Sequence, residues 1–446
     1  MNWRAAGVAA LLVVSAGAAA SGAYAGVRKF RDTPVAQPTV ASPAGEEASA
    51  AAPPSSTAPS EAPRPSRAGV AAALRGPLAD PRLGRRVLVE VRDVASGEVL
   101  ASHGSATPAP PASTAKLATA LAVLAVHETN DRITTRVVTG TQPGTVVLAG
   151  GGDPTLTAAA PGKQGPYAGA AHISDLARQL RGVHVTRVEV DDSLFTGPAV
   201  SPYWAPEDVP SDYAAPIMSS TVDGGRDTPG AELRSTAPDL AAGTALAAAL
   251  GVHRVTRGTA SQQARTLASV ESAPLGTLVG QMLQLSDNVI AESLARQVAL
   301  AEHLPASFSG AAAAVRAVLA RLGTPIGSGL VDGSGLAAGD RLSADTLDRL
   351  LLLATKRTAV LDLLPVAAWS GTLSGRFVHS AGAGVVRAKT GTLTSVSTLA
   401  GLVHDRDGRL LAFALLADRV GPTTADTDRA EAALDRVAST LATCGC

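Results

Sequence analysis

Residues 111–126 read PASTAKLATALAVLAV, a serine and a lysine ahead of a long apolar run. The run from Lys116 to Val126 is apolar nearly all round, which predicts a helix buried inside a core. At the start of such a helix, the side chains of Ser113 and Lys116 share one face. Lysine can activate a serine hydroxyl as its base if burial lowers the lysine pKa, and the helix N-terminus adds donors for an oxyanion. Taken alone, the string is also typical of an ordinary helix start.

Two further strings carry polar groups at the ends of predicted elements. Residues 286–288 read Ser-Asp-Asn ahead of a helical run over 289–295, and alone they would be another helix cap. Residues 389–392 read Lys-Thr-Gly-Thr and lead into a strand predicted to begin at Leu393. This lysine could supply the positive charge that a substrate carboxylate needs, and the glycine lets a ligand approach the backbone closely.

The three strings occur together, in this order, each in a fitting local structure. In this respect the chain resembles the penicillin-binding proteins and serine β-lactamases, which share the three motifs. Three other segments sharpen the resemblance: LAGGGDPTL at 148–156, DDSLF at 191–195 and DGSGL at 332–336. They are similar to segments of the D-alanyl-D-alanine carboxypeptidase/endopeptidase group called the penicillin-binding protein 4 or S13 peptidase family. The resemblance covers about residues 69–440.

The resemblance implies a role for each motif residue. Ser113 would be the acylated nucleophile and Lys116 its proton acceptor, while the serine of 286–288 relays a proton and the asparagine positions the substrate backbone or Lys116. The lysine of 389–392 would help to keep Lys116 neutral and, with the two threonines, bind a terminal carboxylate. The backbone N–H groups of Ser113 and Thr392 would form the oxyanion hole. The implied catalytic residues are Ser113, Lys116, Ser286 and Asn288, and the implied substrate-binding residues are Lys389, Thr390, Gly391 and Thr392.

The implied fold is α/β: a penicillin-binding and serine β-lactamase-like transpeptidase domain, with an antiparallel sheet flanked by helices, a helical subdomain and a large insertion after the nucleophile helix. Local patterns agree, because residues 87–102 read as a β-hairpin and 410–417 as a strand antiparallel to the 393–403 run. An amphipathic helix over 427–441 would pack on the sheet formed by both chain ends. The predicted divisions are a signal peptide or anchor (1–27), a disordered Pro/Ala/Ser-rich linker (28–67), the catalytic domain (68–138 and 273–446) and inserted sequence of one or two domains (139–272).

The N-terminus predicts export. Arg4 precedes an apolar run over 5–20, and Ala-Tyr-Ala at 23–25 has the form of a signal-peptidase site. Weakly apolar sequence continues to Val27 and approaches the ~20 residues that span a bilayer. The segment 5–27 is therefore either a cleaved signal or a retained membrane anchor, and either places the bulk of the chain outside the cytoplasm.

Composition excludes several classes of function. Lys+Arg and Asp+Glu both total 38, which gives a net charge of +0 and no uniformly basic surface, so nucleic acid is a poor partner. The two cysteines, Cys444 and Cys446, lie in a tail that we expect to be frayed. The eight histidines are scattered, without a His-Glu-x-x-His string. We therefore expect no structural metal site and no cofactor.

Rival functions remain to be separated. A serine β-lactamase needs a route to fast deacylation, and the chain has no Glu-x-x-Leu-Asn string to supply it. Penicillins are therefore expected as covalent inhibitors, with peptidoglycan stem peptides as substrates. A penicillin-binding sensor or cell-wall-binding protein with little turnover is the second alternative. The turn at 332–336 and three aspartates of the insertion are expected to be structural; these are Asp153, Asp191 and Asp192.

Overall fold

The computed structural model describes residues 62–357 and 359–446, and the predicted signal or anchor and most of the predicted linker lie outside them. Helix α1 (Arg67–Leu78) begins at the last residue of that linker, with Ser66 as its N-cap. The backbone N–H of Ser66 donates to the carbonyl of Cys446, so the start of the described chain is paired with its end. None of the helices in the described part is long and apolar enough to cross a membrane.

The first sheet combines the two ends of the described chain in the order β2-β1-β10-β9-β8, with every pair antiparallel. The predicted hairpin at 87–102 is confirmed. The prediction that a strand begins at Leu393 is wrong, because residues 389–392 lie inside β8, and a tight turn with Ser395 at φ 62° separates β8 from β9. The strands are β1 (Val87–Asp93), β2 (Val99–His103), β8 (Val386–Leu393), β9 (Val396–His404) and β10 (Leu410–Ala417).

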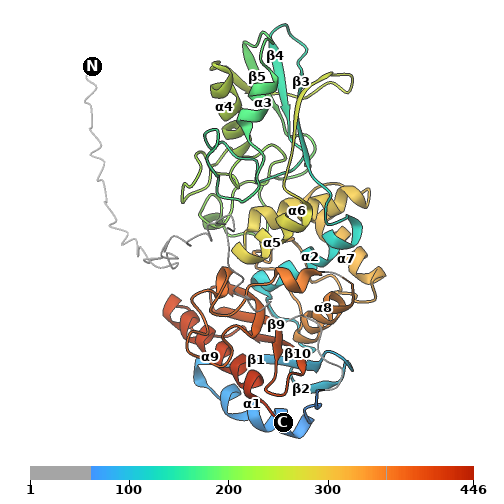
Figure 1. Ribbon diagram of the computed structural model, residues 1–446, viewed down its shortest axis with the longest axis vertical. Helices are drawn as coiled ribbons and strands as arrows, with labels where there is room; N and C mark the ends of the chain where they lie inside the picture. Colours follow the sequence, from blue (N-terminus) through green and yellow to red (C-terminus); the bar gives the residue numbers. More distant parts are fainter. Residues whose placement is uncertain (1–61, 358) are drawn as a thin grey trace, which may run out of the picture. The chain divides into compact units, whose positions relative to one another are not determined.

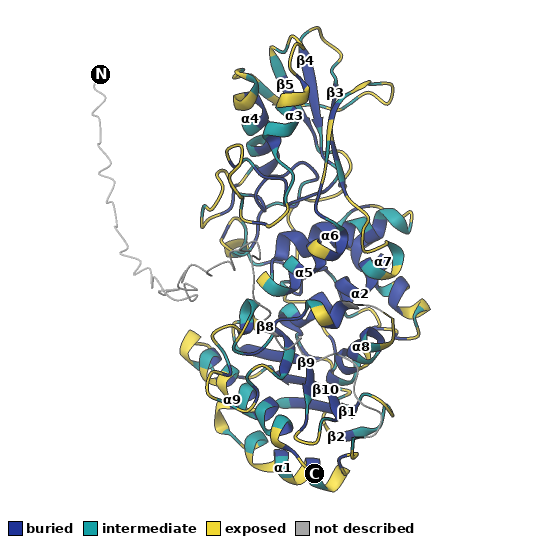
Figure 2. Cartoon of the chain, in the orientation of Figure 1, coloured by how far each residue is buried: buried dark blue, intermediate teal, exposed yellow. Residues whose placement is uncertain are grey.

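Strand β10 shows why this sheet lies in the middle of the fold. All of its residues are apolar and buried (Figure 2). Successive side chains of a strand point to opposite faces of the sheet. Ala412 and Leu416 contribute to a core shared with helices α2 and α8, whereas Phe413 and Leu415 contribute to a core shared with α1 and α9. Helices therefore cover both faces of the sheet (Figure 1). The helices named here are α2 (Lys116–Val126), α8 (Ala344–Arg357) and α9 (Thr424–Thr443).

Helix α2 is the centre of the helical layer. Every residue from Lys116 to Val123 is buried, which confirms the prediction made from its all-round apolar sequence. Apolar side chains of four further helices form one core cluster with it. These helices are α5 (Leu275–Leu285), α6 (Asn288–Ala301), α7 (Phe308–Arg321) and α8.

A second sheet lies in the middle of the sequence, in the order β6-β5-β4-β3-β7. Its first strand begins at Thr134, before the predicted start of the insertion at 139, and its side chains form a core of their own with helices α3 and α4. That 139–272 is an inserted domain stays a prediction. The elements are β3 (Thr134–Thr139), β4 (Thr145–Ala149), β5 (Arg187–Asp191), β6 (Val255–Arg257), β7 (Thr266–Glu271), α3 (Ile173–Gln179) and α4 (Pro238–Leu250).

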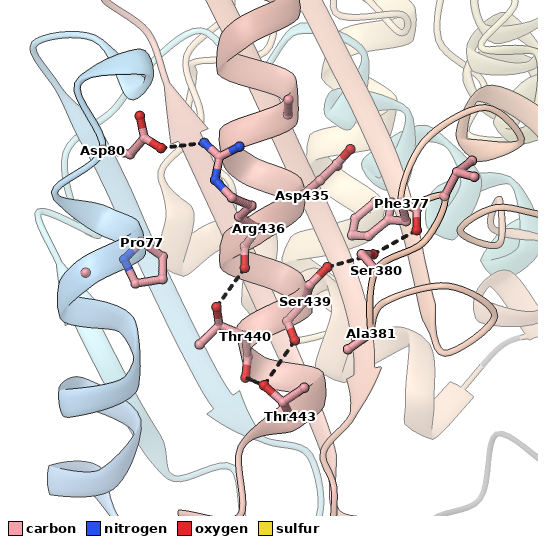
Figure 3. A pocket seen from close by; sticks show the side chains of 13 residues that line it. Pro77, Asp80, Phe377, Ser380, Ala381, Asp435, Arg436, Ser439, Thr440 and Thr443 are labelled. Atoms are coloured by element: carbon pink, nitrogen blue, oxygen red, sulfur yellow. Dashed lines mark hydrogen bonds and ion pairs between the residues drawn. The ribbon is translucent and has the colours of Figure 1, made fainter.

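The C-terminal tail is ordered against α1 rather than frayed. Cys444 and Cys446 form a disulfide, and Cys444 is buried in the core under α1 and α9. The expectation of a loose tail is wrong because the carbonyl of Cys446 accepts hydrogen bonds from the N-cap of α1. Asp80, which follows α1, forms an ion pair with Arg436 of α9, and both residues line a surface pocket (Figure 3).

Phe413→Ala is expected to lower the free energy of unfolding by about 3–5 kcal/mol, because it removes a fully buried ring from a packed core. Urea denaturation followed by circular dichroism measures this loss. The control is Leu233→Ala, which trims a side chain that is 68% exposed and should change the stability by less than about 0.5 kcal/mol. Equal losses for the two variants would contradict the assignment of β10 as the central strand.

Candidate active site

Ser113 lies on a short 3-10 turn, η2 (Ala112–Ala115), which leads directly into α2. Lys116 is the first residue of α2, and its side chain is fully buried, whereas Ser113 is half-buried. One turn of chain therefore brings the two side chains together. Lys116 Nζ lies 2.9 Å from Ser113 Oγ, within hydrogen-bonding distance.

Lys116 has two further partners, both far away in the sequence. Its Nζ donates to Asn288 Oδ1 at 2.6 Å and to the carbonyl oxygen of Ser334 at 2.8 Å. Burial lowers the pKa of Lys116 to about 8, although the negative charges of Asp332 and Asp287 act in the opposite direction. At pH 7 about a tenth of the amine is therefore uncharged, far more than for an ordinary lysine, and an uncharged amine can accept the serine proton.

The Ser-Asp-Asn motif forms the link between α5 and α6. Ser286 has a left-handed backbone with φ 56°, and Asp287 is the N-cap of α6, where its Oδ1 accepts the N–H groups of Val289 and Ile290. This local structure turns the serine toward β8, where Lys389 Nζ donates to Ser286 Oγ at 2.9 Å.

Lys389 itself lies on β8 and is fully buried. Its Nζ also donates to the carbonyl oxygen of Thr390 at 2.8 Å. Burial lowers the pKa of Lys389 well below its usual range, and the positive charges of Lys116 and Arg376 add to the effect.

Gly391 allows β8 to lie against η2, the turn that carries Ser113. A Cβ atom at this position would lie 3.0 Å from the backbone nitrogen of Ser113 and 2.8 Å from the carbonyl oxygen of Pro111. Thr398 Oγ1 on the neighbouring strand β9 donates to the same carbonyl at 2.8 Å, which holds the turn against the sheet. A side chain at 391 would push the strand away from Ser113.

The two threonines of the motif contact residues that the sequence did not single out. Thr390 Oγ1 donates to Thr372 Oγ1 at 2.9 Å, and Thr392 Oγ1 donates to Glu431 Oε1 at 2.7 Å. Thr372 lies on a short turn, η5 (Gly371–Leu373), and Glu431 on α9. A carboxylate thus already accepts a hydrogen bond from Thr392, one of the hydroxyls expected to bind a terminal carboxylate.

The DGSGL turn, expected to be structural, forms part of the wall around Lys116. Asp332 Oδ1 accepts the N–H groups of Ser334 and Gly335, which fixes the turn. Gly335 has φ +81°, and a Cβ there would lie 2.0 Å from the carbonyl oxygen of Ala112. The sequence signal for this packing was the pair of glycines around Ser334, but no pattern indicated that the carbonyl of Ser334 would contact the lysine.

All eight predicted site residues therefore lie in one connected cluster, joined by the contacts of Lys116 with Asn288, of Lys389 with Ser286 and of β8 with η2. The three aspartates of the middle segment each accept backbone N–H groups, as expected of capping carboxylates. The pocket between α1 and α9 in Figure 3 is lined by none of the eight residues.

The geometry can be compared with known proteins. The sequence profile described as the D-Ala-D-Ala carboxypeptidase 3 (S13) family matches residues 70–231 and 226–441. This chain belongs to the S13 peptidase family. The family membership expected from the three motifs is therefore confirmed.

Each of three relatives of this S13 peptidase covers more than four-fifths of its length. It is 44% identical to Carboxypeptidase DacB of Mycolicibacterium smegmatis over 468 residues, which cover 100% of this chain and 99% of the relative. Carboxypeptidase Rv3627c of Mycobacterium tuberculosis is 44% identical, with 86% and 85% of the two chains covered. The crystal structure of penicillin binding protein 4 from Haemophilus influenzae shares the fold, with a TM-score of 0.69, 21% identity and coverage of 82% of this chain and 98% of that one.

Acylation of this S13 peptidase by a penicillin is expected to accelerate as the pH rises through about 8, because the reaction needs the uncharged form of Lys116. The second-order rate constant for labelling by a fluorescent penicillin, measured from pH 6 to 9.5, tests this. Asp332→Asn is expected to move the rise to lower pH, because the native carboxylate favours the charged amine. A rate constant independent of pH would contradict the role of Lys116 as base.

Proposed function

We propose that this S13 peptidase hydrolyses the D-alanyl-D-alanine bond of peptidoglycan stem peptides through an acyl-enzyme on Ser113. The single observation that carries the proposal is the 2.9 Å contact of Ser113 Oγ with the buried amine of Lys116, whose pKa burial lowers to about 8. Membership of a family of D-Ala-D-Ala carboxypeptidases supports the same reaction.

Acylation begins with the attack of Ser113 Oγ on the carbonyl carbon of the penultimate D-alanine, while Lys116 Nζ takes the hydroxyl proton. The carbonyl oxygen becomes an oxyanion, which the backbone N–H groups of Ser113 and Thr392 stabilise. The carbon–nitrogen bond then breaks, and the proton held by Lys116 is relayed through Ser286 to the nitrogen of the leaving D-alanine, which leaves Lys116 uncharged again. The product is an ester between the shortened peptide and Ser113.

Deacylation uses Lys116 as the base a second time, with water in place of the serine hydroxyl. A water molecule attacks the ester carbonyl, and a proton passes from the water to the amine of Lys116. The ester bond breaks, the proton returns to Ser113 Oγ, and the peptide leaves with a free carboxylate. Asn288 holds the amine in place through both steps, because its Oδ1 accepts from Lys116 Nζ at 2.6 Å.

The substrate carboxylate is bound on the other side of the nucleophile. Lys389 supplies the positive charge, because the negative charge of the bound carboxylate raises the pKa of Lys389 and favours its ammonium form, and the hydroxyls of Thr390 and Thr392 supply donors. Thr392 must exchange its present acceptor, Glu431, for the substrate, which is a short-range rotation of one side chain. Gly391 keeps the strand close enough for the substrate to lie along it.

The same chemistry would cut cross-links, so the activity is assigned as carboxypeptidase, D,D-endopeptidase or both. β-Lactams are assigned as covalent inhibitors, and a solved structure of the H. influenzae protein is a complex with a β-lactam. Peptidoglycan places the enzyme outside the cytoplasm. Residues 5–27, which lie outside the described part, serve as a signal peptide or as an anchor.

Ser113→Ala in the full-length protein is expected to abolish both D-alanine release from a pentapeptide and covalent labelling by penicillin, because no other residue supplies the attacking oxygen. Mass spectrometry of the peptide and gel fluorescence of the protein measure the two effects. As a control, Ser309→Ala changes an exposed serine and should leave both unchanged. Penicillin labelling without D-alanine release in the wild type would favour the sensor alternative.

Nitrocefin is expected to be hydrolysed slowly, because each enzyme molecule is acylated once and is then held as a long-lived acyl-enzyme. The reason is that the chain lacks the Glu-x-x-Leu-Asn string that would provide fast deacylation. A burst of absorbance equal to the enzyme concentration, followed by a slow steady rate, is the expected trace. A fast linear trace without a burst would show a β-lactamase instead.

A further inference from the structure

Asp287, the central residue of the Ser-Asp-Asn motif, has two separate sets of partners. Its Oδ1 caps helix α6 by accepting the N–H groups of Val289 and Ile290. Its Oδ2 accepts from Tyr167 Oη at 2.7 Å and from Arg234 Nη2 at 2.9 Å. The second pair of donors belongs to the middle of the chain, between β4 and α4, and not to the helices that carry the motif.

The ion pair of Arg234 with Asp287 is almost completely removed from solvent, with 4% and 6% of the side chains exposed. A buried ion pair persists only when the other donors and acceptors of both groups are satisfied. Arg234 meets this requirement, because its guanidinium also donates to the carbonyl oxygens of Gly224 and Asp212. Burial alone would raise the pKa of Asp287, but Arg234 and the hydroxyl of Tyr167 outweigh burial and lower that pKa to about 2.

The backbone around the pair is shaped to fit it. A Cβ atom on Gly224 would lie 2.0 Å from Tyr167 Oη and 3.0 Å from Arg234 Nη1, and Gly224 has φ +69°. Arg226 Nη1 donates to Tyr167 Oη at 3.2 Å, so the hydroxyl that donates to Asp287 is itself held in place. We call Tyr167, Arg234 and Asp287 the clamp.

Asp287 of the clamp lies in the sequence between two residues that take part in the proposed reaction. Ser286, on one side of Asp287, has a left-handed backbone that is strained for a residue other than glycine, and its Oγ must meet Lys389. Asn288, on the other side, must meet Lys116. A carboxylate fixed from two directions between them prevents both side chains from drifting.

We propose that Tyr167 and Arg234 are positioning residues, which act through Asp287 to hold Ser286 and Asn288 in place, so that the middle segment of the chain sets the rate of acylation at Ser113. The inference rests on the proposed function. It assigns the middle segment a part in catalysis that does not involve contact with the substrate.

Arg234→Ala in the full-length protein tests the clamp, with Arg234→Lys and Tyr167→Phe as milder changes. The matched control is Arg257→Ala, which breaks another ion pair of the same segment and leaves the fully buried carboxylate of Asp239 without its partner. The readouts are the melting temperature, the rate constant of labelling by a fluorescent penicillin, and hydrogen–deuterium exchange of residues 286–292.

Arg234→Ala is expected to slow labelling by about 10- to 100-fold, because small displacements of reacting groups have effects of this size. Both Arg234→Ala and Arg257→Ala should lower the melting temperature, because each removes the partner of a buried carboxylate. Arg257→Ala should nevertheless change the rate constant of labelling by less than about 3-fold. The labelling rate of Tyr167→Phe should lie between the rates of Arg234→Ala and Arg257→Ala. Arg234→Lys should label faster than Arg234→Ala, because an ammonium still pairs with the carboxylate. Exchange at Val289 and Ile290, whose N–H groups Asp287 accepts, should increase in Arg234→Ala only.

Equal loss of labelling in Arg234→Ala and Arg257→Ala, with unchanged hydrogen exchange at 286–292, would overturn the proposal that Tyr167 and Arg234 are positioning residues. The proposed function fails in a different way, by a wild type that neither takes up penicillin nor releases D-alanine. Hydrogen exchange needs no activity, so in that case it still decides whether the middle segment holds the Ser-Asp-Asn motif.

Discussion

The burial of one amine, that of Lys116, is the constraint on which the rest of the site depends. Removing an ammonium group from water is unfavourable, so burial lowers the pKa of Lys116. Three hydrogen-bond acceptors surround its Nζ. One acceptor is the hydroxyl of Ser113, the proposed nucleophile, one belongs to α6 and one to the DGSGL turn. The desolvation that makes the lysine useful as a base therefore also requires three separate segments to meet.

The fold satisfies this requirement with elements from distant parts of the sequence. Asn288 and the carbonyl of Ser334 are 172 and 218 residues from Lys116, and Lys389 is 103 residues from Ser286. Burial of the amine in α2 needs an apolar surrounding, which the neighbouring helices supply, and the close approach of β8 needs a glycine opposite the nucleophile turn. The positive charge of Lys116 also lowers the pKa of the buried Lys389 nearby.

Local patterns predicted much of this site, and tertiary contacts account for what they missed. The all-round apolar run after Lys116 predicted a buried helix, and the motif residues predicted the groups that meet around it. The contact of the Ser334 carbonyl with Lys116, and those of Tyr167 and Arg234 with Asp287, left no trace in periodicity or spacing, because partners so far apart are set by the packing of whole elements. Strand β8 was predicted too late along the chain because its polar motif interrupts the apolar pattern.

The pKa of Lys116 is the most direct test of the account. The chain contains only five lysines, so a protein labelled with carbon-13 lysine gives few Cε resonances, and Lys116→Ala identifies the one that matters. The account predicts a titration midpoint for Lys116 near 8, well below the ordinary lysine value. A midpoint near 10.4 would leave only about one amine in 2,500 uncharged at neutral pH, and the proposed activation of Ser113 would be wrong.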